Sequence, residues 1–316
     1  MNHPFRIILV EGVPFTGKST TSEYITTQLG LNGYPARWIS EGTLFQRHFT
    51  QTMAMTDQEK PFSTDIWHDE WQSFIAAAQA SDEVLVVDSS LSYVGVLPLM
   101  TEDWPNERIA AEFTRIAALF APLRPRVIHL TGDVDRLVPA SIVDRGEAWH
   151  DQMIRQSDCA PYQQARGRSG LEGAIAMLRE SQAVTAELLA RDGWQALSLD
   201  VTDRNWAAHQ RAILDFLDLR EVVVERPEIE RSVLEAYAGT YLSDDPAKDD
   251  RPLVVELEGD TLILGAPRQR YGPLVPLSPT RFHLRASPID VEFAAGEGRR
   301  LTLLWADGRS ESFHRA

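Results

Sequence analysis

The sequence predicts an α/β protein, with a parallel five-stranded sheet and flanking helices, followed by a C-terminal antiparallel β barrel or sandwich. Strand-like and helix-like runs alternate five times over residues 1–220, and such alternation is typical of a parallel sheet with helices on both faces. After residue 220, short β-like runs separated by turn residues indicate antiparallel structure. At 316 residues, the chain is long enough for two cores.

The strands expected in the parallel sheet are short apolar runs, separated by segments with helical periodicity. Residues 84–87 (VLVV) are continuously apolar, as in a strand buried on both faces. The expected strands are residues 5–10, 36–40, 84–87, 126–130 and 194–199. The expected helices are residues 21–29, 43–55, 63–80, 89–100, 106–120, 134–144, 171–191 and 205–219, with a polar, arginine-containing excursion over 145–170.

Two domains joined by a linker are expected. Residues 1–220 form the first domain, residues 221–232 a charged, proline-containing linker, and residues 233–316 the second, β-rich domain. The turn sequence Gly259-Asp260 fits a hairpin. The expected strands of the second domain are residues 237–242, 253–258, 261–264, 281–285, 289–293, 301–305 and 311–314.

Charge and composition exclude several classes of protein. The net charge of −15 argues against a nucleic-acid partner and against binding to anionic membranes. Cys159 is the only cysteine, which excludes an intramolecular disulfide and a cysteine-rich zinc site. The apolar runs are too short to span a membrane, and the N-terminal run is too short for a signal peptide. We therefore expect a cytoplasmic protein.

The sequence EGVPFTGKST at residues 11–20 contains the pattern GxxxxGKS (Walker A) between the first expected strand and helix. Its glycines permit backbone conformations in which successive N–H groups surround a phosphate, and the helix N-terminus adds partial positive charge. Lys18 can then reach the β- and γ-phosphates, and the Ser19 hydroxyl can ligate Mg²⁺. We expect ATP and Mg²⁺ as cofactors, with nucleotide contacts from Gly12, Thr16, Gly17, Lys18, Ser19 and Thr20.

Two acidic residues follow other expected strands. Asp88 ends the buried run 84–87, where an acidic group would hold Mg²⁺ together with Ser19; the alternative role is a cap for the next helix. Glu41 follows the second strand, where a carboxylate could orient and deprotonate an acceptor hydroxyl. The alternative role of Glu41 is to favour the start of the next helix.

Residues 5–219 resemble the P-loop kinases of the thymidylate kinase and deoxynucleoside kinase group. The resemblance rests on EGVPFTGKST as the phosphate loop, VLVVDSS at residues 84–90 as the third-strand acidic motif, and DRGE at residues 144–147 as the lid. It implies that Glu41 accepts the proton of the attacking hydroxyl and that Arg145 is the lid arginine, with Arg136 and Arg155 as rivals.

The resemblance also bears on the phosphate acceptor. In the group, an arginine follows the third-strand acid and contacts the substrate, but Ser89 and Ser90 stand here. This departure favours a hydroxyl acceptor over a nucleoside monophosphate. Aromatic rings in the acceptor-covering segments would suit a planar group, although the helical spacing of Trp67, Trp71 and Phe74 favours core packing for at least one of them. The expected acceptor contacts are Phe45, Arg47, Trp67, Trp71 and Tyr93.

Residues 233–316 resemble the small β-rich domain appended to some β-lactamase-related serine hydrolases. The segments that carry this resemblance are LEAYAGTYLS, VELEGDTLIL, LVPLSPTRFHL and IDVEFAAGEGRRLTLLW. The resemblance implies a fold and little about activity. Several roles stay open for this β-rich domain. It could cover the kinase cleft, self-associate into a homo-oligomer, bind a small apolar ligand or simply stabilise the protein.

We therefore expect an enzyme, an ATP- and Mg²⁺-dependent phosphotransferase that moves the γ-phosphate to a hydroxyl of a small molecule, either nucleoside-like or a natural product such as an antibiotic. One alternative is a nucleoside monophosphate kinase of the thymidylate kinase type. The other is an ATP-binding regulatory module that acts through the β domain.

Overall fold

The computed structural model of the chain describes residues 4–57, 62–245, 252–294, 299–306 and 308–316, without the side chains of residues 56–57 and 142–144. Its internal contacts divide the chain into two compact units. One unit comprises Met1–Pro139 and Met153–Val222, and the other comprises Ala140–Gln152 and Val223–Ala316. In the parts of the chain that the structure describes, no helix has the length and apolar character needed to cross a membrane.

The first unit contains the five-stranded parallel sheet that the sequence predicts. Its described strands are β1 (Ile7–Glu11), β2 (Ala36–Ile39), β3 (Val84–Asp88), β4 (Arg126–Thr131) and β5 (Ala196–Asp200), in the spatial order β2-β3-β1-β4-β5. The register pairs Val10 with Asp88 on β3, and Glu11 with His129 on β4. The chain crosses from one side of β1 to the other between β3 and β4, and ligands of open α/β sheets bind at the carboxyl ends of the strands at such a point.

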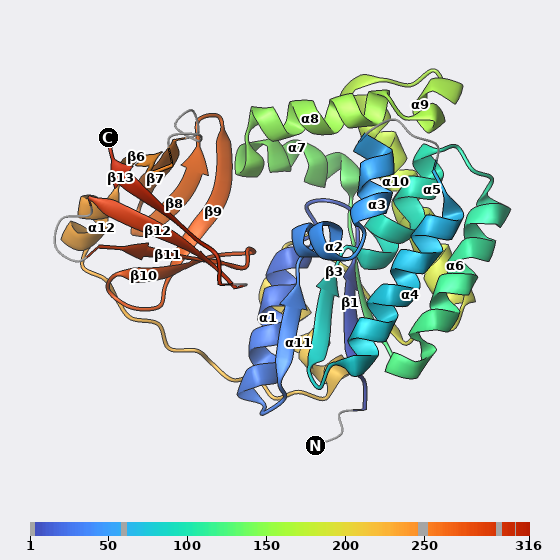
Figure 1. The fold of residues 1–316 in the computed structure, drawn as a ribbon, viewed down its shortest axis with the longest axis horizontal. Helices are drawn as coiled ribbons and strands as arrows, with labels where there is room; N and C mark the ends of the chain where they lie inside the picture. The colour runs from blue at the N-terminus through green and yellow to red at the C-terminus, as the bar shows by residue number, and fades with distance from the viewer. Residues whose placement is uncertain (1–3, 58–61, 246–251, 295–298, 307) are drawn as a thin grey trace. The chain divides into compact units, whose positions relative to one another are not determined.

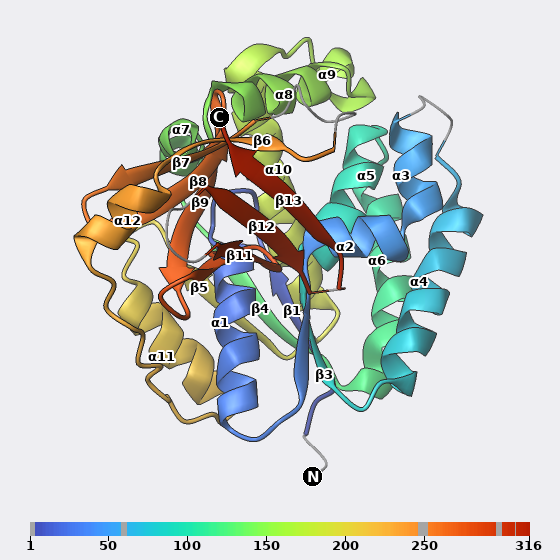
Figure 2. The same ribbon diagram turned by 60° about the vertical axis from the view of Figure 1, so that its left-hand side comes forward.

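Helices cover both faces of the sheet, because successive residues of a strand point to opposite sides. On one face, Ile8 and Val10 pack with α1 (Lys18–Leu31) and α11 (Trp206–Leu217). On the other face, Ile7 and Leu9 belong to a core shared with α4 (Thr64–Ala80), α6 (Asn106–Phe120) and α10 (Gly170–Arg191). Figure 2 shows α1 and α11 on one side of the strands, and α4 and α6 on the other.

The helix expected after β3 is irregular in the structure. Ser89 has a left-handed backbone (φ 62°) and leads into a π-helix, η1 (Ser90–Val96), which continues as α5 (Leu97–Thr101). Local strain and π-helical turns of this kind concentrate at functional sites. The periodicity of residues 89–100 could not distinguish this arrangement from an ordinary helix.

Two further segments differ from the expectation. The single helix expected over residues 43–55 is two helices, α2 (Glu41–Arg47) and α3 (Thr50–Asp57). The expected excursion over 145–170 is largely helical. It contains the end of α7 (Val134–Arg145), α8 (Glu147–Asp158) and α9 (Pro161–Ala165).

The second unit contains a closed antiparallel barrel (Figure 1). A short helix, α12 (Arg231–Tyr237), precedes it. Each strand pairs with its neighbours in sequence, and the first pairs with the last, so that the barrel has no free edge. The eight described strands are β6 (Gly239–Ser243), β7 (Leu253–Glu258), β8 (Thr261–Ala266), β9 (Gln269–Pro276), β10 (Arg281–Leu284), β11 (Ile289–Phe293), β12 (Arg300–Trp305) and β13 (Ser310–Arg315).

Aromatic side chains fill the barrel. The rings of Tyr237 and Phe293 are stacked with their centroids 4.1 Å apart, and Phe282 packs edge-on against both. The buried Tyr241 hydroxyl donates to the Tyr237 carbonyl oxygen at 2.7 Å. The barrel is therefore held by its own hydrophobic core.

Candidate functional site

The loop after β1 has a glycine with positive φ at each end, where a Cβ atom would lie too close to neighbouring atoms. Gly12 has φ 143° and Gly17 has φ 81°. A Cβ atom at Gly12 would lie 2.2 Å from the Leu130 carbonyl oxygen, and one at Gly17 would lie 2.6 Å from the Trp206 ring. Phe15, between them, also has a positive φ of 75°. The GxxxxG spacing is therefore required by the close approach of the loop to β4 and α11.

Two polar side chains of the loop share one acceptor. The Thr16 hydroxyl donates to the Val13 carbonyl oxygen at 2.8 Å, and Lys18 Nζ donates to the same oxygen at 3.1 Å. Both side chains are buried. Among the described residues, no side chain caps the N-terminus of α1, and its first turn holds no acidic residue. The N–H groups and positive end of α1 are therefore directed at the loop, with no acidic residue of the helix's own first turn beside them.

Asp88 is a fully buried carboxylate at the end of β3, beside the loop. Its pKa is raised to about 6, mainly by burial and also by the nearby Glu41 carboxylate, while the Ser19 hydroxyl, Lys18 and the Glu41 backbone N–H oppose the rise. Neither Asp88 oxygen accepts a hydrogen bond of regular geometry from the described residues, although the Ser19 hydroxyl and the Glu41 N–H lie near enough to lower its pKa. The structure thus brings Lys18, Ser19 and Glu41 near Asp88, and their roles in a site stay predictions.

The free oxygens of Asp88 fit a divalent cation. Mg²⁺ is usually held by one or two carboxylates together with substrate phosphates and water, and a buried carboxylate without partners is otherwise costly. Asp88 and Ser19 are the residues that would hold the ion. Asp88 lies near Ser19 because alternate residues of a strand point to the same face of the sheet. Val84 and Val86 pack on the face covered by α1, and Asp88 is the next residue of β3 on that face.

Glu41 is the first residue of α2, which Ser40 caps by accepting a hydrogen bond from the Thr43 amide. Its carboxylate lies in the first turn of the helix and near enough to Asp88 to raise the pKa of that residue. Both roles that the sequence left open are therefore compatible with its position.

Glu11 is a site residue that the sequence reasoning did not single out. It is fully buried at the end of β1 and accepts four hydrogen bonds of 2.7–2.8 Å from residues 90–92. The donors are the Ser90 and Ser92 hydroxyls and the Leu91 and Ser92 amides. Burial raises the pKa of Glu11, and these four bonds oppose the rise. A charged residue within an otherwise apolar strand was the available signal.

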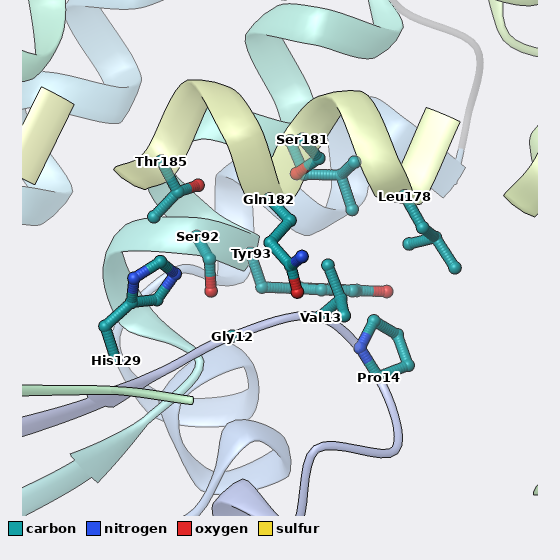
Figure 3. Close-up of a pocket in the computed structure, with 11 residues that line it drawn as sticks. Gly12, Val13, Pro14, Ser92, Tyr93, His129, Leu178, Ser181, Gln182 and Thr185 are labelled. Carbon is teal, nitrogen blue, oxygen red and sulfur yellow. The ribbon is translucent and has the colours of Figure 1, made fainter. Parts of the chain in front are cut away.

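A narrow pocket lies between the loop, η1, β4 and α10. Gly12, Val13 and Pro14 form one wall, and Tyr93 from η1 and Leu178 from α10 contribute to the others. Figure 3 shows Thr185, Ser92 and His129 gathered at one end of this pocket, and Pro14 and Leu178 at the other. It was not visible in the sequence, because its residues come from four separate segments.

The expected acceptor residues fall into two groups. Tyr93 lines the pocket, and the Phe45 ring packs against the Tyr93 ring with centroids 5.4 Å apart. Arg47 is exposed at the end of α2. Trp67 and Trp71 are fully buried. Trp67 Nε1 donates to the Val94 carbonyl oxygen at 2.9 Å, and Trp71 packs among other aromatic rings. These two tryptophans are core residues in this structure and leave no ring face for a ligand.

Arg145 ends α7 with an exposed side chain and belongs to the second compact unit. Its role as the lid arginine stays a prediction.

The fold and the loop define the class of the first unit, an α/β sheet of order 2-3-1-4-5 with a P-loop at the carboxyl end of its first strand. No protein-family model matches the chain, and no curated protein matches it.

Solved structures with distant similarity include a gluconokinase from Sinorhizobium meliloti 1021 (16% identity, TM-score 0.37, covering 69% of this chain and 94% of that one). A sugar kinase from Janibacter sp. HTCC2649 is similar at 17% identity and a TM-score of 0.35, covering 68% of this chain and 96% of that one. The YorR protein from Bacillus subtilis, in complex with phosphorylated GDP, is similar at 13% identity and a TM-score of 0.36, covering 67% and 95% respectively.

Proposed function

We propose that the first unit is a P-loop kinase, which uses ATP and Mg²⁺ to phosphorylate a hydroxyl of a small molecule. The observation that carries this proposal is the meeting of Lys18, Ser19 and Glu41 around the Asp88 carboxylate, whose two oxygens accept no hydrogen bond of regular geometry from the described residues. Phosphoryl transfer needs mainly positioning and neutralisation of charge. A lysine, a hydroxyl, a free carboxylate and open helix N–H groups supply both.

Each residue has a distinct role in the proposed reaction. The loop N–H groups and Lys18 bind the β- and γ-phosphates, and Ser19 and Asp88 hold the metal ion, which neutralises phosphate charge when bound. Glu41 orients the acceptor hydroxyl and takes its proton. As the new bond from the acceptor oxygen to the γ-phosphorus forms, the bond from that phosphorus to the bridging oxygen breaks, and ADP leaves. Arg145 is the proposed lid arginine.

A neutral hydroxyl acceptor is favoured over a nucleoside monophosphate. Ser89 and Ser90 occupy the positions where a substrate-binding arginine would be expected. The Ser90 hydroxyl donates to Glu11, directly before the loop, at 2.7 Å. Its hydrogen is therefore used within the protein. In this proposal residues 1–220 carry the catalytic domain, residues 221–232 the linker, and residues 233–316 a separate barrel.

The test is ADP release with Mg²⁺ across a panel of nucleosides, nucleoside monophosphates and hydroxylated antibiotics. We expect one acceptor class to accelerate release, and Lys18→Ala to reduce that rate by about 100-fold or more. ATP hydrolysis that no acceptor accelerates would contradict the kinase and favour an ATP-dependent regulatory module.

Glu41→Gln separates the two roles of that residue. We expect kcat to fall by about 100-fold with the KM for ATP unchanged, because general-base catalysis contributes about 10²–10⁴. Glu107→Gln is the matched control, since Glu107 also lies in the first turn of a helix and is exposed. Equal effects of both substitutions on kcat would show that Glu41 only favours the start of its helix.

A further inference from the structure

The deep end of the pocket in Figure 3 holds polar side chains whose hydrogen-bonding groups are unused. His129 and Thr185 are each 1% exposed. Neither ring nitrogen of His129 nor the Thr185 hydroxyl has a partner among the residues that the structure describes. Buried polar groups are nearly always hydrogen-bonded. Both side chains therefore offer hydrogen-bonding groups to a molecule that enters this end of the pocket.

The sheet register explains why these side chains lie close to the phosphate loop. His129 pairs with Glu11 across β1 and β4, and both continue the strand positions that face α10. Ser92, the third polar residue at this end, already donates its hydroxyl proton to Glu11 at 2.7 Å. His129 and Thr185 are thus left without a protein partner while the Glu11 network is complete.

The size of the pocket limits what can enter it. The pocket as a whole has a cavity volume of about 10 Å³, which corresponds to about one water or hydroxyl oxygen. Val13, Pro14 and Tyr93 line the same pocket, so a molecule that contacts the loop at Val13 could extend one group inward.

The chemistry of the walls favours a neutral group. No lysine or arginine is among the described residues that line the pocket. Burial lowers the pKa of His129 to about 4, so its ring is uncharged at neutral pH and offers one donor and one acceptor. A carboxylate or phosphate would lose its hydration without meeting a positive charge. A hydroxyl can donate to one partner and accept from the other.

We propose that His129 and Thr185 form a subsite for one neutral hydroxyl of the phosphate acceptor, next to the phosphate loop. That the bound molecule is the phosphate acceptor rests on the proposed kinase function. That the subsite binds a hydroxyl does not depend on that function. It narrows the acceptor to a molecule with a second hydroxyl that can reach into the pocket while another is phosphorylated.

Crystals of the full chain, soaked separately in ethylene glycol, sodium acetate and sodium phosphate, test the subsite without any enzyme assay. We expect a glycol oxygen within about 2.7–3.2 Å of a His129 ring nitrogen and of Thr185 Oγ1, and neither anion in the pocket. Thr185→Val keeps the shape and removes an unpaired hydroxyl, so it should fold normally and lose the glycol. Thr27→Val, at an exposed threonine of α1, is the control and should keep it.

Three results would overturn the proposal: an ordered water that glycol never displaces, an anion bound between the two side chains, or glycol binding that survives Thr185→Val. With an acceptor from the panel, Thr185→Val should raise the acceptor KM at least about 10-fold and leave the KM for ATP unchanged; equal changes in both would also overturn it. If no acceptor is phosphorylated, the kinase proposal fails while the glycol experiment still decides the subsite.

Discussion

Replacing Asp88 with asparagine is expected to stabilise the protein at neutral pH while removing its proposed metal ligand. The pKa of Asp88 is raised from its ordinary value of 3.8 to about 6, mainly by burial. Well below pH 4 the carboxyl is protonated in both the folded and the unfolded chain, so it imposes no penalty. As the pH rises from about 4 to about 6, the unfolded chain ionises while the folded chain keeps its proton, and stability is lost.

The size of the effect follows from the pKa difference. About two pKa units at 1.36 kcal/mol each correspond to about 3 kcal/mol of destabilisation at pH 7. Asp88→Asn removes the charge, so it should raise the free energy of unfolding by up to about 3 kcal/mol at neutral pH and leave it nearly unchanged below about pH 4. The buried amide also lacks partners, which makes this an upper value.

Urea unfolding followed by tryptophan fluorescence measures this difference. Six of the eight tryptophans lie in the first unit, so the signal reports mainly on it; they are Trp38, Trp67, Trp71, Trp104, Trp194 and Trp206. Asp215→Asn, at an exposed carboxylate of α11, is the control and should change little. Mg²⁺ and ATP at 100 times Kd should raise the free energy of unfolding of the wild type by about 3 kcal/mol. The same ligands should stabilise Asp88→Asn less. Destabilisation by Asp88→Asn without nucleotide at pH 7 would refute the reasoning.

Gly12→Ala should destabilise the fold by about 3 kcal/mol in urea unfolding, because its Cβ would lie 2.2 Å from a carbonyl oxygen at φ 143°. Gly30→Ala, in open space within α1, should stabilise it by about 0.5–1 kcal/mol; a similar loss at both positions would contradict the argument. Glu11→Gln and Glu70→Gln should each cost about 3 kcal/mol, because both buried carboxylates accept several hydrogen bonds. Of these two variants, only Glu11→Gln should weaken ATP binding in calorimetry. Equal ATP affinities of the two variants would show that the hydrogen bonds from η1 to Glu11 do not position the loop for ATP.

The parallel sheet could be predicted from the sequence because its strands are local signals. Residues 84–87 are apolar without interruption, and the glycines and lysine of residues 12–18 have a fixed spacing. The barrel was expected with seven strands, and the structure adds β9. Gly272, Pro273 and Pro276 obscure that strand, because glycine and proline argue against a strand in sequence reasoning.

The rest of the site depends on contacts between distant segments. Glu11 receives its hydrogen bonds from residues about 80 positions along the chain, and the unused groups of His129 and Thr185 meet only after β4 and α10 have packed. Helical spacing could not decide whether Trp67 and Trp71 face a ligand or the core, and their complete burial assigns them to the core here. Patterns of polarity predict which face is buried, but the partner across that face is set by the tertiary fold.

The most direct test of the kinase proposal follows the γ-phosphate itself. ATP labelled at the γ-position is incubated with Mg²⁺ and each acceptor of the panel, using wild type, Lys18→Ala and Glu41→Gln. We predict that the label appears in an organic phosphate with the wild type and falls by about 100-fold with either variant. Label found only in inorganic phosphate, at a rate that no acceptor and no Glu41 substitution changes, would contradict phosphoryl transfer by this site.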